Sequence, residues 1–368
     1  MNGVMAGMLG LVLLWSNGAS AACDWPAWQH FQRAYISEQG RVIDPAGGRD
    51  ITTSEGQSYG MFFALVADDR DTFAQLLQWT QNNLAAGDMT ARLPAWLWGQ
   101  DQQQQWGVLD SNSAADSDLW LAYDLLEAGR LWQNRRYLML GTLLLQRIAR
   151  EEVADIPGLG AMLLPGKNGF VDEQRWTLNP SYLPPQLLAR FAAFEGPWQA
   201  MQHSNQRLLL EAARTGLVPD WVVWQPDEGW LLDSKSGSVG SYDAIRSYLW
   251  AGMLADEAPE RAPLMAHLQP MAELTATRGV PPEHVDVVTG KASGIGPVGF
   301  SAALLPLLQH TSAAEVQRRR LAAMPVGEQA YYDAVLTLFG QGWDQRRYAF
   351  NQAGELVPEW DNSCSNSR

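Results

Sequence analysis

The chain has 368 residues, of which 46% are hydrophobic, enough for one large domain or two ordinary ones. Its formal net charge of -14 argues against a nucleic-acid partner and against anchoring on anionic lipid, because like charges repel. The 17 Trp residues outnumber the 10 Phe and the 10 Tyr, and such broad aromatic faces either fill a core or stack on sugar rings.

Residues 3–15 form a mostly apolar run that is followed by the small residues of segment 19–22. This pattern predicts a secretory signal over residues 1–22, cleaved after Ala21 or Ala22, although no Lys or Arg precedes the run. The run is short for a bilayer span and no other stretch could cross a membrane. We therefore expect an exported protein, periplasmic or else extracellular, without stable membrane insertion.

Two cysteines, Cys23 and Cys364, lie at the two ends of the predicted mature chain. In an oxidising compartment a disulfide between them would stabilise the fold by restricting the unfolded chain. The alternative is two unpaired thiols in terminal tails, and the sequence leaves both open.

Helical periodicity recurs along the chain. Apolar residues at three- and four-residue spacing predict helices near residues 25–37, 53–67, 73–84, 116–132, 135–153, 183–194, 198–214, 242–254, 259–277, 297–308, 313–323 and 328–339. Only short loop pieces and the tail, where 347–350 and 355–357 flank a turn, look like β hairpin.

About twelve helices in closely linked pairs predict an all-α fold, a toroid of six helical hairpins. In such a ring the inner helices run parallel, so their N-terminal ends meet at one mouth. Two helical bundles are the alternative, but no Pro-, Ser- or Gly-rich linker marks a boundary, which favours a single domain over residues 23–368.

Three long segments, 85–113, 155–181 and 216–241, fall just before predicted inner helices and are rich in Trp. Loops of that length in a compact domain usually bind something or are disordered, and the aromatic content argues against disorder. We expect these segments to wall a binding site, the alternative being that their rings cap the end of the barrel.

The polar segment Thr52–Gly60 begins one of the predicted inner helices. Thr52 with Glu55, and Ser54 with Gln57, have the spacing of a capping box. Taken alone, Glu55 is adequately explained as part of a helix cap.

Two further carboxylates stand at the start of predicted inner helices. Asp116 follows Ser113 with capping-box spacing, and Asp243 precedes Arg246 by one helical turn. Each alone is explained by capping or by an i, i+3 ion pair, but the toroid would gather them around one cavity with Glu55.

Carboxylates in an aromatic-lined groove are what glycoside hydrolysis requires: one protonates the leaving oxygen, and another activates water or attacks the anomeric carbon. A helix N-terminus favours the ionised form of a carboxyl group, so a catalytic acid placed there needs burial or a neighbouring carboxylate to raise its pKa. Asp116 could be that neighbouring carboxylate for Glu55. The five His are scattered without metal-ligand spacing, and no nucleotide-binding or G-x-S-x-G motif occurs, so no metal or cofactor is predicted.

Five motifs, in the expected order over essentially the whole mature chain, resemble glycoside hydrolase family 8. They are Thr53-Ser-Glu-Gly-Gln-Ser-Tyr-Gly60, Asp110-Ser-Asn-Ser with Ala115-Asp-Ser-Asp-Leu-Trp120, Asn179-Pro-Ser-Tyr182, Ser241-Tyr-Asp-Ala-Ile-Arg246 and Phe339-Gly-Gln-Gly-Trp343. The chain departs from the family's A-[ST]-D-[AG]-D pattern at Ala115 and Ser117, small substitutions that leave both aspartates in place.

The resemblance implies an (α/α)6 barrel and an inverting endo-β-1,4-glucanase that needs no metal and acts on a β-1,4-glucan chain. By position in the motifs, Glu55 would be the general acid and Asp243 the general base. Asp116 is the family's third acidic residue, described in places as a nucleophile, and in an inverting mechanism it fits better as the residue that positions the sugar and water. The positions that resemble substrate contacts are Asn112, Arg175, Trp176, Tyr182, Tyr242 and Arg246, with Trp96 and Trp98 as stacking platforms.

The resemblance also implies a role in bacterial cellulose production, and it leaves docking on the synthase or export machinery open. One alternative function is a non-catalytic glucan-binding component of that machinery, which the presence of all three carboxylates argues against. A mixed-linkage glucanase or a chitosanase is the alternative among enzymes.

Overall fold

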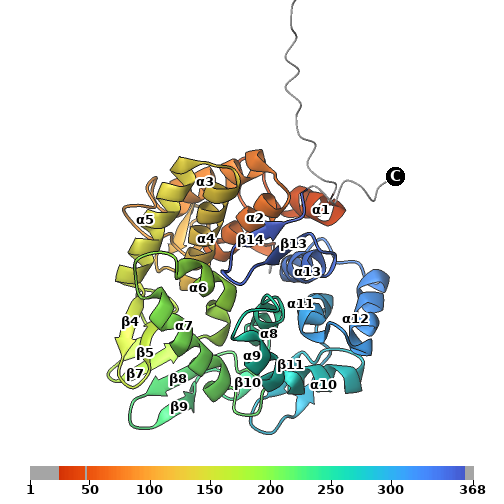
Figure 1. Cartoon of the computed structure of the whole chain (residues 1–368). Helices are drawn as coiled ribbons and strands as arrows, with labels where there is room; N and C mark the ends of the chain where they lie inside the picture. The colour runs from red at the N-terminus through yellow and green to blue at the C-terminus, as the bar shows by residue number, and fades with distance from the viewer. Residues whose placement is uncertain (1–24, 46–47, 361–368) are drawn as a thin grey trace, which may run out of the picture.

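The computed structural model describes residues 25–45 and 48–360. Its helices form two concentric rings, and inner and outer helices alternate along the chain except at one outer position that two consecutive helices share (Figure 1). The predicted signal over residues 1–22 and both cysteines, Cys23 and Cys364, lie outside the described residues. No helix within the described ranges is both long and apolar enough to cross a bilayer.

The inner helices are buried over most of their length, and most of their residues are accordingly apolar. They are α2 (Ser54–Val66), α4 (Ala115–Leu131), α6 (Pro185–Phe191), α8 (Ala244–Gly252), α11 (Val298–Leu308) and α13 (Tyr331–Asp344). The outer helices are α1 (Pro26–Tyr35), α3 (Arg70–Leu84), α5 (Arg135–Glu151), α7 (Trp198–Arg207), α9 (Arg261–His267), α10 (Gln269–Arg278) and α12 (Ser312–Ala323). The predicted all-α toroid is confirmed.

Aromatic packing closes the inner ring between its last and first helices. The Phe339 ring of α13 lies 4.6 Å from the Phe63 ring and 5.0 Å from the Tyr59 ring of α2, both edge to face. It also stacks on Phe62 at 5.3 Å. Such pairs contribute beyond the area that they bury, so this cluster joins the two ends of the chain into one core.

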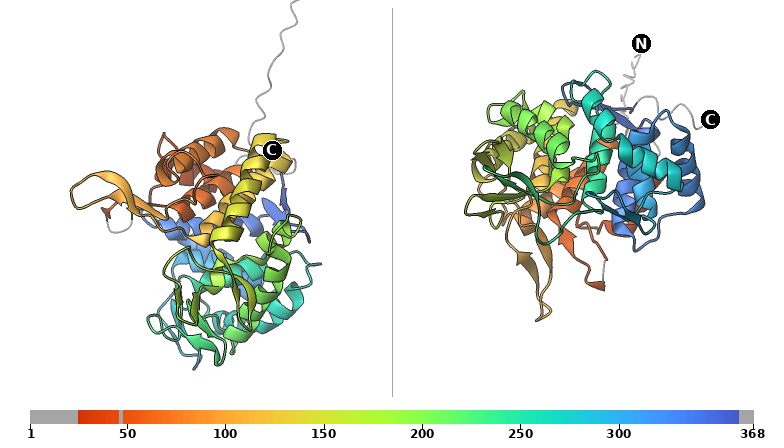
Figure 2. Two further views of the ribbon diagram at one scale, coloured as in Figure 1. Left: turned by 90° about the vertical axis from the view of Figure 1, so that its left-hand side faces the viewer. Right: turned by 90° about the horizontal axis from the view of Figure 1, so that it is seen from below.

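The two ends of the barrel differ. At the C-terminal end of the inner helices lies a hairpin of β13 (Tyr348–Phe350) and β14 (Leu356–Pro358), as predicted from the tail sequence. Buried Glu127 of α4 holds it there by accepting from Arg190 Nε at 2.6 Å and from the Leu356 N–H at 2.8 Å. The long segments project from the other end (Figure 2).

The three long segments are not structureless, because each contributes strands to small antiparallel sheets. The sheets are β1 (Thr52–Thr53) with β2 (Leu97–Gln100) and β3 (Trp106–Asp110); β4 (Val153–Ile156) with β5 (Gly160–Leu163); β6 (Val171–Asp172) with β7 (Arg175–Leu178), β8 (Val222–Gln225) and β9 (Gly229–Leu232); and β10 (Val239–Gly240) with β11 (His284–Asp286) and β12 (Ala292–Ser293). Since β1 runs directly into α2, the β2–β3 hairpin is an extension of the mouth (Figure 2).

One predicted helix proves to be two. The expected helix over 259–277 is broken at Leu268 into α9 and α10. Pro270 explains the break, because it has no N–H to bond the carbonyl of Ala266 and its ring clashes with that carbonyl. The helix expected over 198–214 likewise ends early, at Arg207, and continues as one wider turn over Leu208–Ala212.

The last inner helix begins later and ends later than the predicted 328–339. It covers Tyr331–Asp344 and so contains Gly340, where a side chain would collide with the neighbouring helix α11: an added Cβ would lie 1.9 Å from the Ala302 carbonyl oxygen. Helices α11 and α13 therefore pack backbone against backbone at this point.

Gly340→Ala is expected to lower the free energy of unfolding by about 1–3 kcal/mol, because overpacking outweighs the better helix propensity of alanine. Denaturant unfolding followed by Trp fluorescence measures the change. Gly327→Ala is the matched control, since a Cβ there meets nothing within 4 Å. Equal stability of the two variants would contradict the close packing.

Candidate active site

Residues at the N-terminal ends of α2, α4, α8 and α13 line a single cavity of about 390 Å³. Its lining includes Glu55, Asp116 and Asp243, the three carboxylates that the sequence predicted to meet. Aromatic rings supply much of the remaining wall, namely Trp96, Tyr182, Tyr242, Tyr331 and Tyr332. The parallel inner helices thus bring together residues that are far apart in sequence.

The start of α2 is capped differently from the prediction. Thr53, rather than Thr52 or Ser54, caps the helix by accepting from the Gly56 N–H at 3.0 Å. Thr52 is buried and donates to the Val42 carbonyl, and Gln57 also turns inward, where it accepts from the Val42 N–H. Glu55 is left free of capping contacts.

The start of α4 also departs from a capping box. Ser113 does not cap α4: its hydroxyl donates to Glu152 at 2.5 Å and accepts from the Lys167 N–H at 3.1 Å. Asp116 accepts from the adjacent Ser117 N–H at 2.8 Å. The Ser117 hydroxyl lies 2.6 Å from that of Ser54 on α2, which ties the starts of these two inner helices together.

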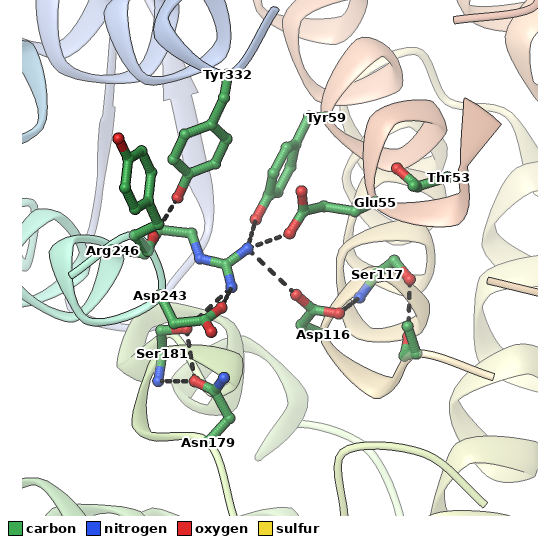
Figure 3. Close-up of polar contacts among 12 residues, drawn as sticks. Thr53, Glu55, Tyr59, Asp116, Ser117, Asn179, Ser181, Asp243, Arg246 and Tyr332 are labelled. Atoms are coloured by element: carbon green, nitrogen blue, oxygen red, sulfur yellow. Dashed lines mark hydrogen bonds and ion pairs between the residues drawn. The ribbon is translucent and has the colours of Figure 1, made fainter. Parts of the chain in front are cut away.

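Arg246 is the common counter-ion of the three carboxylates (Figure 3). Its Nη1 contacts Glu55 Oε2 and lies 3.5 Å from Asp116 Oδ2, while its Nη2 lies 2.8 Å from Asp243 Oδ1. The guanidinium is almost fully buried and also donates to the Ser181 hydroxyl at 3.1 Å. The sequence predicted Arg246 as a substrate contact. The structure shows that it contacts all three candidate catalytic carboxyl groups.

The three carboxyl groups differ in exposure. The side chains of Glu55 and Asp243 are 25% and 32% exposed, whereas that of Asp116 is only 4% exposed. Burial, with the charge of Glu55 second, raises the pKa of Asp116 to about 8. Burial also raises the pKa of Asp243, with Arg246 opposing the shift. Asp116 therefore keeps its proton to a higher pH than an exposed aspartate does.

A second pair of buried carboxyls lies behind Asp116. Asp118, two residues further along α4, and Glu152, at the end of α5, are both fully buried. Burial raises the pKa of Glu152 to about 8, and burial with the neighbouring Glu152 raises that of Asp118 well above its ordinary value. The second aspartate of the motif thus lies in the core beside Glu152 instead of lining the cavity.

Several predicted sugar contacts lie around the cavity without lining it. Trp98 on β2 stacks on Trp106 of β3 at 5.1 Å, with the Arg41 guanidinium 4.5 Å from its ring. Asn112 holds the neighbouring loop by donating to the Asn168 carbonyl at 2.9 Å.

A second cavity, of about 770 Å³, lies beside β7 and β8. Arg175 lines it together with Phe170 and Trp221. Trp176, in contrast, is half-buried against the core and pairs in register with Trp224 of β8. Some Trp residues of the long segments therefore line the cavities and others pack into the core. Each of the two expectations for these rings thus holds for part of them.

Sequence reasoning missed two tyrosines and one aspartate of the site. Tyr331 and Tyr332 line the cavity from the start of α13, the position that the carboxylates occupy on their helices. They were overlooked because the helix was expected to begin three residues earlier. Asp220 was missed because its role is non-local: it accepts from the Ser241 and Ala244 N–H groups at 2.7 and 2.8 Å and so holds the start of α8.

Comparison with known proteins places this arrangement in a wider context. The family model for glycosyl hydrolases family 8 matches residues 1–346. An endoglucanase of Salmonella typhi is 58% identical over 358 residues, covering 97% of each chain, and one of Escherichia coli K12 is 56% identical over 367 residues, covering all of both.

Solved structures agree with the sequence relatives. The endo-1,4-D-glucanase of Vibrio fischeri ES114 is 49% identical with a TM-score of 0.88, over 92% of this chain and 100% of its own. The endo-β-1,4-glucanase of Acetobacter xylinum is 29% identical with a TM-score of 0.72, over 86% and 95% of the two chains.

Proposed function

The chain belongs to glycosyl hydrolase family 8, and we infer that it is an endoglucanase that hydrolyses internal bonds of β-1,4-glucan. The observation that carries this function is the meeting of Glu55, Asp116 and Asp243 in one aromatic-lined cavity. An acidic cleft with flat rings suits a neutral polysaccharide, whose sugar faces stack on the rings.

The finer proposal is an inverting acid/base mechanism. Glu55 gives its proton to the glycosidic oxygen as the bond to the anomeric carbon breaks, while Asp243 takes a proton from the water that attacks that carbon from the opposite face. Glu55 and Asp243 contact different terminal nitrogens of Arg246, so the guanidinium lies between them. The inverting course is supported by the resemblance of the motifs to family 8.

Asp116 is proposed to position the sugar. Burial raises the pKa of Asp116 to about 8, and in its protonated form the carboxyl can donate a hydrogen bond to a sugar hydroxyl beside the reacting carbon. Its small exposure and its bond from the Ser117 N–H hold it in one orientation. A group of this kind makes a poor nucleophile, which favours the positioning role.

Inversion predicts the stereochemistry of the first product. Hydrolysis of a cello-oligosaccharide should release the new reducing end as the α anomer, because water attacks opposite the β-linked leaving group. Proton NMR within the first minutes, before mutarotation, distinguishes the anomers. Release of the β anomer would instead mean a double displacement with a carboxylate nucleophile.

Substrate preference is tested by comparing turnover on carboxymethyl cellulose, lichenan and chitosan. We expect carboxymethyl cellulose to be cleaved with rapid loss of viscosity, as internal cuts require. Faster turnover of lichenan or chitosan would favour a mixed-linkage glucanase or a chitosanase. Binding without new reducing ends on any of the three would favour a non-catalytic glucan-binding component.

Export to the periplasm and a role in bacterial cellulose production are further parts of the proposal. The apolar run over residues 3–15 and the small residues after it support export. N-terminal sequencing of the protein from a periplasmic fraction should begin at Ala22 or Cys23. Deletion of the gene in a cellulose-producing host should change the cellulose yield, and an unchanged yield would separate the enzyme from that process.

A further inference from the structure

Trp221 lies between the two cavities and touches the proposed base. It lines the second cavity just before β8, and its indole N–H donates to Asp243 Oδ2 at 3.1 Å. The indole nitrogen can only donate, so the direction of this bond is unambiguous. With Arg246 Nη2 at 2.8 Å from Oδ1, each oxygen of Asp243 contacts a donor.

The indole is itself held in place. Its ring lies parallel to that of Phe170, with centroids 6.1 Å apart, and meets Tyr182 at 5.8 Å and 62°. The preceding residue, Asp220, accepts from the backbone N–H groups of Ser241 and Ala244 and so joins this segment to the start of α8. Trp221 and Asp243 are therefore fixed relative to each other.

We propose that Trp221 is a positioning residue for the general base, holding one oxygen of Asp243 so that the carboxylate faces the attacking water. A carboxylate with one donor on each oxygen cannot rotate about its Cβ–Cγ bond without breaking both contacts. Trp221, Arg246 and the Asn179 side chain together occupy three of about four lone-pair sites of the carboxylate, which leaves one for the water proton. The inference rests on the proposed function, in which Asp243 is the base.

The bond also affects the proton affinity of Asp243. The titratable groups that face this carboxyl are Arg246, Asp220, Glu55 and Asp116, and Asn179 contributes a side-chain hydrogen bond. Burial raises the pKa of Asp243, and a donor to the charged form opposes that shift. Removing the Trp221 N–H should raise the pKa further, so the acid limb of the pH profile should move to higher pH.

Trp221→Phe tests the inference because it removes the N–H and keeps a ring. We expect kcat on a cello-oligosaccharide to fall about ten- to a hundredfold, the usual range for a hydrogen bond to a charged group, with a smaller change in KM. The acid limb of kcat/KM should move to higher pH. Trp221→His should restore part of kcat above pH 7. Neutral imidazole can donate an N–H from Nε2, which is two bonds from Cγ, as indole Nε1 is.

Trp224→Phe is the matched control. It makes the same change on the adjoining strand, where the indole N–H donates to the Pro157 carbonyl at 2.9 Å. We expect wild-type kcat and a wild-type pH profile. The inference would be overturned by any of three results. They are the same loss of kcat in Trp224→Phe, wild-type kcat in Trp221→Phe, or a kcat in Trp221→His that is no higher than that of Trp221→Phe.

Asp243→Asn separates this inference from the proposed function. An inactive Asp243→Asn with a fully active Trp221→Phe would refute the positioning role alone. An active Asp243→Asn would refute the assignment of the base and the inference with it. Near-ultraviolet circular dichroism of each variant confirms that the comparison is between folded proteins.

Discussion

Glu55→Gln is expected to lower kcat on cellulosic substrates by about 10²–10⁴-fold while cello-oligosaccharide binding is retained. The amide has the shape of the acid but cannot give a proton to the leaving oxygen, and general acid catalysis is typically worth that factor. Steady-state rates of reducing-end release measure kcat. Quenching of Trp fluorescence by cello-oligosaccharides measures binding, since Trp96 lines the same cavity.

The leaving group distinguishes a proton donor from a merely structural glutamate. The dinitrophenolate of a dinitrophenyl cello-oligosaccharide leaves the anomeric carbon without protonation, so Glu55→Gln should hydrolyse this substrate with a much smaller loss of rate. Glu151→Gln is the control, because Glu151 also pairs with an arginine, Arg147, but on the outer helix α5. If Glu55→Gln lost activity equally on both substrates, or kept normal activity on cellulose, Glu55 would not be the acid.

Arg246→Met is expected to lower the free energy of unfolding by about 3–5 kcal/mol at neutral pH. Arg246 is buried and contacts Glu55, Asp116 and Asp243, so its loss leaves three carboxyl groups near one another without their cation. Methionine occupies a similar volume, which makes the change mainly one of charge. Denaturant midpoints at several pH values measure it.

The pH dependence of this effect has a definite sign. Without the guanidinium, the folded carboxyl groups bind protons more tightly than the unfolded ones, whose pKa values are near 4. A folded state that holds more protons loses stability as pH rises, so the deficit should be larger at pH 8 than at pH 5. Arg207→Met, which breaks the partly exposed pair with Glu211, should cost less than about 1 kcal/mol at both. A deficit that did not change with pH would mean that Arg246 acts through packing alone.

The stability of the wild-type protein should also fall as pH rises, because of its own buried carboxyl groups. Asp116 and Glu152 both have a pKa raised to about 8. Each therefore contributes stability that is present below its unfolded pKa near 4 and is lost as pH rises towards 8.

The positions of the catalytic candidates could be predicted because helix starts have local signals. Polar residues just before an apolar run located Glu55 at the start of α2, and the same pattern located Asp116 and Asp243. The capping partners were wrong at Thr52 and Ser113, since Ser and Thr side chains bond whichever backbone or side-chain group lies within reach. The helix start is a more robust inference than the identity of its cap.

The short sheets could not be predicted in the same way. Strands of two to five residues in the long segments carry too few positions for an alternating pattern, and their pairing joins distant parts of the chain, as in β7 with β8. The division of the Trp residues depends on that pairing. Trp224 is buried by it, whereas Trp221, three residues earlier, reaches Asp243.

The sequence by itself determined the number of helices closely, the all-α toroid, and the three carboxylates at helix starts, because each rests on periodicity and composition within a few residues. Only the tertiary structure decided that one buried arginine contacts all three carboxyl groups, that burial raises the pKa of Asp116 to about 8, and that Trp221 contacts Asp243. Burial, charge neutralisation and proton affinity depend on which side chains meet across the ring. Those meetings follow from the packing of whole helices and have no local signal in the chain.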